Sequence, residues 1–243
     1  MAESDLRETT NADRLLPVQP LLSKHYRGEA FFANLDALMR AVLPVRSIEE
    51  KWDIATKPGV TYASLGCDLN TLHLYQLLIR IGGYKRVLEL GTYIGVSTLF
   101  LAEAAGPRGC VTTVENGGEF FAIAARNIER NGYGTRVQML QADALTALRS
   151  QPQCEYDFIL IDAAKQDYDR MLMPALVCLR PGGLLLFDDV LMHGDMLNPR
   201  PSLDKSAGVR KMLDMVASRR DSLSSVLLPI GNGLLLIRPQ EAA

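Results

Sequence analysis

The 243-residue sequence has little that would suit a secreted, membrane-spanning or nucleic-acid-binding protein. Its four cysteines form no Cys-x-x-Cys pair, and their wide spacing is typical of reduced, mostly buried thiols. The first residues are polar and acidic, unlike a signal or transit peptide. No apolar run reaches the roughly 18 residues that span a bilayer, and a net charge of −2 lacks the basic excess of a nucleic-acid-binding face. We therefore expect a cytoplasmic protein with neither a membrane nor a nucleic acid as its partner.

The N-terminal quarter of the chain predicts helices rather than strands. Residues 1–20 are polar and contain prolines, which is typical of a loose arm. Apolar residues recur at helical spacing over 31–43. Ser47 begins a Ser-x-x-Glu capping box with Glu50, which predicts a second helix there. A third helix is predicted over 68–81, apolar along one face.

From residue 86 onward, β-rich runs alternate with helical stretches. The predicted strands are 86–90, 110–115, 137–141, 158–161 and 184–187; the predicted helices are 97–105, 119–131, 144–150, 168–179 and 208–218. This alternation indicates a parallel sheet with helices on both faces. Two final strands, 225–228 and 234–237, flank a Gly-Asn-Gly turn and are expected to be antiparallel neighbours.

The first predicted strand leads into a glycine-containing turn where a ligand would bind. Ligands of open α/β sheets bind beyond the carboxyl ends of the strands, and strand 86–90 is followed here by Gly91-x-x-x-Gly95. A dinucleotide site would have Gly-x-Gly-x-x-Gly at this point, so the observed spacing favours a ligand without a pyrophosphate. Because the sequence also lacks a Tyr-x-x-x-Lys pair, a nicotinamide-dependent oxidoreductase is only a distant alternative.

Polar residues also end the second and third strands. Glu115 stands where a carboxylate can accept both hydroxyls of a ribose, and Asp143 with Ala144 stands where an adenine edge could be held. Each residue alone is ordinary at a turn or a strand end. Their occurrence after successive strands predicts a nucleoside-containing cofactor at this edge of the sheet.

The fourth and fifth strands end in three aspartates. Asp162, Asp188 and Asp189 are expected at adjacent strand ends, and such oxygen ligands fit a hard divalent cation such as Mg²⁺. The alternative is that one or two of them only cap loops or helices. Lys165 lies about one helical turn after Asp162. It could act as a base if nearby positive charge lowered its pKa, or it could simply pair with the aspartates.

Together these motifs resemble the cation-dependent O-methyltransferases, the family that includes catechol and caffeoyl-coenzyme A O-methyltransferases. The resemblance runs from about residue 61 to 239. It rests on VLELGTYIGVS (87–97), the acid at 115, IDAAKQDY (161–168), GGLLLFDDVL (182–191) and PIGNGLLLIRP (229–239). It implies a seven-stranded Rossmann-like α/β sheet, mostly parallel with a C-terminal antiparallel hairpin. It also implies S-adenosylmethionine and a divalent cation as cofactors and a small-molecule hydroxyl as the methyl acceptor.

The resemblance also assigns roles to individual residues. The methionine part of the cofactor is assigned to Glu89, Gly91, Tyr93 and Ser97, the ribose to Glu115, and the adenine edge to Asp143 and Ala144. Asp162, Asp188 and Asp189 match the metal ligands, Asp162 also lying near the cofactor, and Lys165 matches the catalytic base. We further expect one structural domain overall, in which residues 1–60 form an N-terminal arm and helices that contact the substrate or a partner subunit and residues 61–243 form the methyltransferase domain. The expected assembly is a homodimer.

Two departures from the family pattern leave the acceptor open. The family usually has Asp-Asn where this chain has Asp188–Asp189, and often has an acid at the position of Ala164. A third carboxylate makes the site more tolerant of larger ions, so Mn²⁺ or Ca²⁺ is an alternative to Mg²⁺. A catechol-like acceptor with vicinal oxygens is expected; a sugar or carrier-bound hydroxyacyl intermediate of antibiotic biosynthesis is the alternative. Trp52 and the 192–196 stretch either shape the acceptor pocket or pack in the core.

Overall fold

The protein is described here by a computed structural model, which covers residues 38, 41–44, 47–56, 68–198 and 200–240. The chain divides into two compact units, residues 1–42 and 43–243, and nearly all described residues belong to the second. The predicted arm over 1–20, most of the predicted helix over 31–43 and the domain boundary at 60 lie outside the described residues. These three remain predictions.

The second unit is built on one seven-stranded sheet with the order β3-β2-β1-β4-β5-β7-β6. Strands β1 to β5 are parallel, and β7 is antiparallel to both β5 and β6. The strands are β1 (Arg86–Leu90), β2 (Cys110–Glu115), β3 (Val137–Gln141), β4 (Tyr156–Ile161), β5 (Leu179–Phe187), β6 (Leu223–Leu228) and β7 (Leu234–Pro239). The predicted parallel sheet and its closing hairpin are thus confirmed.

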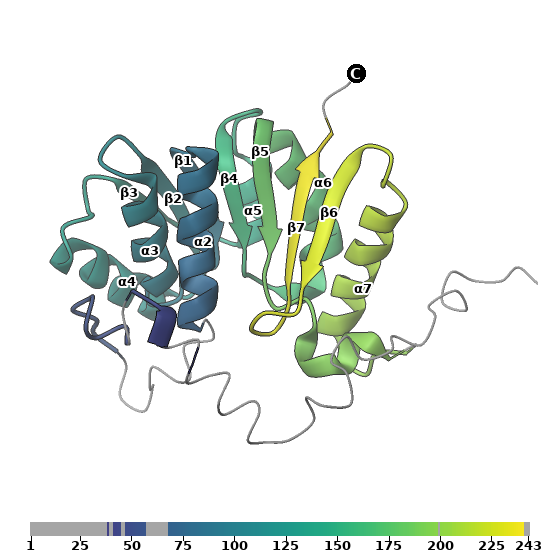
Figure 1. Cartoon of the computed structure of the whole chain (residues 1–243), viewed down its shortest axis with the longest axis horizontal. Coiled ribbons are helices and arrows are strands. Elements are labelled where there is room, and N and C mark those ends of the chain that lie inside the picture. Colours follow the sequence, from purple (N-terminus) through teal and green to yellow (C-terminus); the bar gives the residue numbers. More distant parts are fainter. Residues whose placement is uncertain (1–37, 39–40, 45–46, 57–67, 199, 241–243) are drawn as a thin grey trace, which may run out of the picture. The chain divides into compact units, whose positions relative to one another are not determined.

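Helices cover both faces of the sheet, as the alternation of strands and helices predicts (Figure 1). One face packs against α2 (Leu69–Gly82), α3 (Val96–Ala105) and α4 (Gly118–Arg130), and the other against α5 (Ala144–Arg149), α6 (Tyr168–Cys178) and α7 (Asp204–Ala217). Successive strand residues point to opposite faces, so Ile159 lies in the α5–α7 core while Leu160 lies in the α2–α4 core. This is why β4 and β5 contain unbroken apolar runs.

The segment before α2 differs from the prediction. Ser47 Oγ does accept from the Glu50 amide at 3.3 Å, but the expected second helix is a single turn that ends at Trp52. The backbone amides of Asp53 and Ala55 donate instead to the side chains of Asn131 and Asn127. These two amides, which would have continued the helix, are therefore bonded to side chains that are distant in the sequence.

Two further expectations can be compared with the described residues. No helix among them is long and apolar enough to cross a membrane. Of the three described cysteines, only Cys178 is buried, so the expectation of mostly buried thiols is wrong for Cys110 and Cys154. Both exposed cysteines lie outside the strand and helix interiors, where an apolar pattern gives no information on burial.

Candidate active site

A cavity of about 270 Å³ opens at the carboxyl ends of the parallel strands. Six of the predicted cofactor residues line it: Gly91, Tyr93, Glu115, Asp143, Ala144 and Asp162. Ser97 lines a smaller adjoining hollow that shares Gly91, Tyr93 and Asp162 with the first. Residues from four different strand ends therefore meet in one place, at the edge of the sheet where the sequence predicts a ligand.

Gly91 allows two strand ends to approach each other closely. Its φ of +102° is unfavourable for a residue with a side chain. A Cβ atom at this position would overlap the backbone carbonyl of Asp162. The Gly91 amide donates to the Val114 carbonyl and the Asp162 amide donates to the Leu90 carbonyl, which joins the ends of β1, β2 and β4.

Glu115 is fixed by two backbone amides. Its Oε2 accepts from the Tyr93 amide and its Oε1 from the Gly117 amide, each at 2.8 Å. Tyr93 has a left-handed φ of +52°, and its ring packs on Phe120 with the centroids 4.5 Å apart. Each carboxylate oxygen has a further lone pair with which it can accept a hydrogen bond from a ligand.

Glu89 lies beneath the cavity wall and does not line it. Its side chain is fully buried, and its oxygens accept from the hydroxyls of Ser97, Thr98 and Thr113. Thr92 extends this network through a 2.6 Å contact with Thr113. Burial raises the pKa of Glu89 to about 7, although the three hydroxyls oppose the rise. Glu89 is therefore linked to the adjoining hollow through Ser97, and Thr92 of the same network lines that hollow as well.

The raised pKa of Glu89 predicts a pH dependence of stability. Folding raises the pKa from 4.5 to about 7, so the folded protein binds more protons than the unfolded chain between these values. The stability from this group is then complete below pH 4.5 and is lost as the pH rises through 7, by about 3 kcal/mol. We expect denaturant titrations of the cofactor-free parent, relative to Glu89→Gln, to show this decline. Parallel curves for the two proteins from pH 4.5 to 8 would contradict it.

Asp143 has an ordinary structural role as well as a place in the cavity. Its side chain accepts from the Thr146 amide at 2.8 Å and so caps α5. The same bond, with the Thr146 hydroxyl, holds the pKa of Asp143 below its usual value. Asp143 is therefore a helix-capping residue, an ordinary role for an acid after a strand. Because Asp143 and Ala144 also line the cavity, their predicted contact with an adenine remains a proposal.

Lys165 joins the cavity to the third predicted aspartate. Its ammonium forms ion pairs with Asp162 and, at 3.2 Å, with Asp189. Burial alone would lower the pKa of Lys165, but the two carboxylates outweigh it and the pKa is raised. In this state Lys165 is a charged partner of the aspartates, as the pairing alternative predicts. It can act as a base only when another cation binds the two carboxylates, because the pKa of Lys165 then falls.

Asp188 is held by two tyrosines that the sequence interpretation missed. The Tyr75 hydroxyl donates to Asp188 Oδ2 at 2.5 Å, and the Tyr168 hydroxyl donates to the Asp188 backbone carbonyl at 2.8 Å. The Asp189 amide donates to Asp188 Oδ1. Burial raises the pKa of Asp188 to about 7, with Asp162 adding to the rise. Tyr75 belongs to the buried stripe of α2, where a pattern of apolar spacing marks it only as a core residue.

The three aspartates have the donor chemistry of a divalent-cation site. All their side-chain donors are oxygens, as Mg²⁺ or Mn²⁺ prefers, and a cation, the Lys165 ammonium, already bridges Asp162 and Asp189. Three or more acidic, cysteine or histidine side chains arranged around a common ion position are not found within the described part of the chain. The three aspartates therefore have the oxygen donors that the ion prefers. In this structure two of them, Asp162 and Asp189, are bridged by Lys165.

The turn that carries Lys165 is packed tightly against α7. A Cβ atom on Gly208 would lie 2.6 Å from the Lys165 carbonyl oxygen. Tyr168 begins α6 directly after this turn and is fully buried. Packing against Gly208 on one side and the buried Tyr168 on the other thus fixes the position of Lys165. The sequence gave no sign that Gly208 matters to the site.

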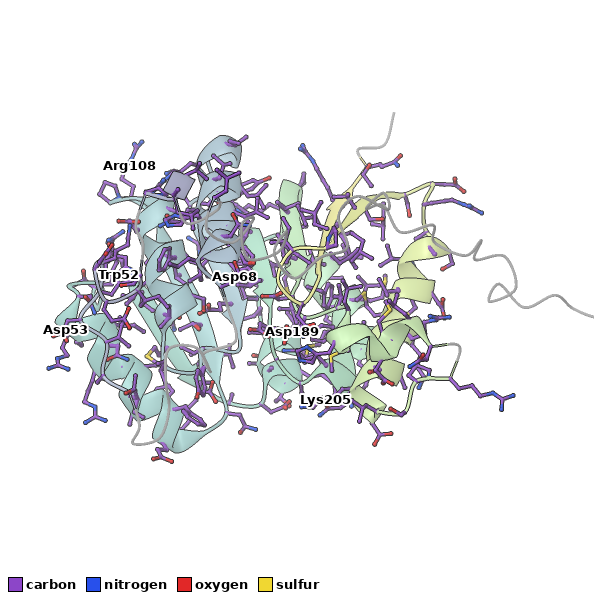
Figure 2. The ribbon with its side chains drawn as sticks, turned by 60° about the horizontal axis from the view of Figure 1, so that its bottom comes forward. Trp52, Asp53, Asp68, Arg108, Asp189 and Lys205 are labelled. Carbon is purple, nitrogen blue, oxygen red and sulfur yellow. The ribbon has the colours of Figure 1, made fainter. Side chains whose placement is uncertain are left out.

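Trp52 and the methionines of the 192–196 stretch pack in the core. Trp52 contacts Phe100 and Tyr133 edge-on, with centroids 5.9 and 5.5 Å away, and Figure 2 shows it well apart from Asp189. Met192 and Met196 are buried in the cluster beneath α7. The core-packing alternative is therefore the correct one for these residues. A second hollow, about 530 Å³, lies over Ala55 and α4 and contains none of the predicted site residues.

Comparisons with known proteins found relatives in sequence and in fold. A family model described as O-methyltransferase matches residues 54–240. A catechol O-methyltransferase of Niastella koreensis is 31% identical over 209 residues, which is 85% of this chain and 86% of the relative. An O-methyltransferase of Streptomyces achromogenes involved in tomaymycin synthesis, solved with S-adenosylmethionine, superposes with a TM-score of 0.74 at 25% identity, covering 86% of this chain and 96% of that one. The Bacillus cereus O-methyltransferase solved with S-adenosylhomocysteine gives a TM-score of 0.72 at 25% identity, covering 85% and 97%.

Proposed function

The chain belongs to the O-methyltransferase family, and from this premise we propose that it methylates a catechol-like acceptor with the help of a divalent cation. As an S-adenosylmethionine-dependent O-methyltransferase it is not the nicotinamide-dependent oxidoreductase of the distant alternative. The observation that carries the proposal is the position of Asp162. This residue lines the cofactor cavity and also pairs with Lys165, which pairs in turn with Asp189. A methyl donor in the cavity would therefore lie beside the groups that activate the acceptor.

The cavity residues would bind the cofactor in three parts. Glu115 would accept from the two ribose hydroxyls with the lone pairs that Tyr93 and Gly117 leave free. Asp143 and Ala144 would meet the adenine, and Ser97, held by Glu89, would meet the methionine part. Gly91 would let the backbone come close to the ligand because no side chain intervenes.

Glu115→Ala is expected to weaken S-adenosylmethionine binding by about 10- to 150-fold, since hydrogen bonds to a charged acceptor contribute about 1.5–3 kcal/mol. Isothermal titration calorimetry measures this. Glu129→Ala, on the outer face of α4, is the matched control and should bind like the parent. A dissociation constant unchanged in Glu115→Ala would remove this residue from the cofactor site.

Asp162, Asp188 and Asp189 would hold the divalent cation, which when bound would stabilise the anion of an acceptor hydroxyl. With the cation on the carboxylates, Lys165 in its neutral form would accept the proton from that hydroxyl. The buried surroundings of Asp188 would exclude water from the acceptor. The oxygen would then attack the methyl carbon in line as the carbon–sulfur bond of S-adenosylmethionine breaks, leaving S-adenosylhomocysteine. Holding oxygen and carbon in this geometry would supply much of the rate acceleration.

Mg²⁺ is the ion we propose, with Mn²⁺ or Ca²⁺ as alternatives because Asp189 adds a third negative charge. The same Asp-Asp pair supports a second candidate acceptor, a sugar or carrier-bound hydroxyacyl intermediate. The similarity to a protein of tomaymycin synthesis is also consistent with a role in secondary metabolism. We further propose that residues 1–60 contact the acceptor or a partner subunit, and that the protein is a homodimer, which light scattering of the full chain would test.

The acceptor class can be determined with one screen. Methyl-labelled S-adenosylmethionine is incubated with the protein, Mg²⁺ and a panel of catechols, phenylpropanoid thioesters, hydroxylated sugars and hydroxyacyl carriers. We expect label in catechols and not in the matching monophenols, which lack the second oxygen. Label in the monophenols at equal rate, or only in the sugars or the hydroxyacyl carriers, would contradict the catechol proposal.

A further inference from the structure

The turn between β6 and β7 is bonded to the loop that carries the two adjacent aspartates. The Val190 amide donates to the Gly233 carbonyl at 3.0 Å, and the Leu191 amide donates to the Asn232 carbonyl at 2.8 Å. The Asn232 side chain accepts from the His193 amide at 2.9 Å and lies 3.3 Å from the His193 ring nitrogen Nε2. Four contacts, made by Val190, Leu191 and His193, thus tie the β6–β7 turn to the loop that contains Asp188 and Asp189.

The loop needs such support because its backbone conformation is unfavourable. Asp189, Met192 and His193 all have left-handed φ values, of 61°, 45° and 52°. Residues with a Cβ seldom adopt this conformation, and it persists only where surrounding contacts impose it. Gly233 lets the turn come close enough, because a Cβ atom there would overlap the Leu191 side chain and lie 2.9 Å from its amide nitrogen.

The same turn also touches the helix that holds Asp188. A Cβ atom on Gly231 would lie 2.9 Å from Asp68 Oδ2 and 3.2 Å from Thr71 Oγ1, so the turn passes directly over the first turn of α2. Asp68 caps α2, and Tyr75 of the same helix donates to Asp188. The turn therefore contacts both α2, whose Tyr75 binds Asp188, and the loop that contains Asp188 and Asp189.

We propose that the β6–β7 turn, through Asn232 and Gly233, is a positioning element for the acceptor half of the site, which consists of Asp188, Asp189 and Lys165. It holds the backbone of Asp189 in the conformation in which this residue reaches Lys165, and it leaves the cofactor half untouched. The proposal rests on the proposed function insofar as Asp188 and Asp189 bind the cation. None of the cavity residues on β1, β2 or β3 contacts this turn through a hydrogen bond among those described.

The test compares Asn232→Ala and Gly233→Ala with the parent in three measurements on the full chain. Binding of Mn²⁺ to cofactor-free protein is followed by electron paramagnetic resonance, and S-adenosylmethionine binding by calorimetry. Amide hydrogen exchange is measured for peptides covering 188–196 and 91–97. We expect Mn²⁺ affinity to fall about tenfold in both variants, as for residues that orient metal ligands, and exchange to accelerate in 188–196 only. Cofactor affinity should stay at the parent value.

Two further variants make the result specific. Asn232→Asp keeps an oxygen acceptor for the His193 amide and should restore slow exchange at that amide. Gln138→Ala removes an exposed amide side chain from β3 and should behave like the parent. Equal losses of Mn²⁺ and cofactor affinity would show a general loss of structure and overturn the proposal, as would parent-like values for both. A parent that binds no Mn²⁺ would contradict the metal site instead, and the exchange data would still decide whether the turn holds the loop.

Discussion

Lys165→Met is expected to lower kcat by about 10²- to 10⁴-fold, the usual contribution of a general base, with little effect on the cofactor's dissociation constant. Methionine is unbranched like lysine and nearly as long, but it cannot accept a proton or pair with a carboxylate. Lys165 is 13% exposed and lies against Asp162 and Asp189, so no nearby water-exposed group can easily replace it. Single-turnover kinetics with labelled cofactor would measure the effect on the chemical step.

Lys165→Arg separates the two roles that remain open for this residue. Arginine keeps the positive charge between the aspartates but does not give up its proton. If Lys165 is the base, the arginine variant should be nearly as inactive as the methionine variant. If Lys165 only pairs with the acids, arginine should retain most of the activity, and that result would contradict the base assignment. Lys205→Met, an exposed lysine on α7, is the control.

Gly91→Ala is expected to abolish measurable cofactor binding, raising the dissociation constant more than about 100-fold. Two effects add: the left-handed φ of +102° and the overlap of a Cβ atom with the Asp162 carbonyl. Backbone strain and overpacking each cost about 1–3 kcal/mol, and the shift needed to relieve the overlap would move Asp162 away from the cavity.

The matched control for this prediction is Gly83→Ala. Gly83 also has a left-handed φ, of +65°, but a Cβ atom there would meet nothing within 4 Å. It should therefore lose only about 1–2 kcal/mol of stability from the backbone conformation and bind the cofactor like the parent. Calorimetry and denaturant unfolding of both variants test this. Equal cofactor affinity in the two alanine variants would show that the contact between Gly91 and Asp162 is not important for the site.

The strands and helices of the sheet domain could be predicted from sequence because each is a local pattern. The apolar run of β4 ends before Asp162, which lines the cavity, and Asp68 marks the start of α2 as a capping residue should. Six of the residues predicted for the cofactor share one cavity for the same reason: parallel strands bring their carboxyl ends to one edge. In the sheet order β3-β2-β1-β4 the ends of β1, β2 and β4 are neighbours, which brings Gly91, Glu115 and Asp162 together.

What the sequence could not predict depends on contacts between distant segments. The single turn after Ser47 ends because Asn127 and Asn131, more than 70 residues later, bind the amides of Asp53 and Ala55. Tyr75 reads as part of an apolar helix stripe, yet its hydroxyl binds Asp188, 113 residues away. The sequence left open whether Trp52 lines a pocket or packs in the core, and its contacts with Phe100 and Tyr133 place it in the core.

The metal requirement of methyl transfer tests the central proposal most directly. The full-length protein is freed of metal by chelation, its metal content is checked by elemental analysis, and catechol methylation is measured in EDTA and after addition of Mg²⁺ or Mn²⁺. Calorimetric titration of S-adenosylmethionine in EDTA shows that the cofactor half is intact. We expect no turnover in EDTA and full recovery with the added ion. Full turnover by protein shown to be metal-free would contradict a role for Asp162, Asp188 and Asp189 in holding a catalytic cation.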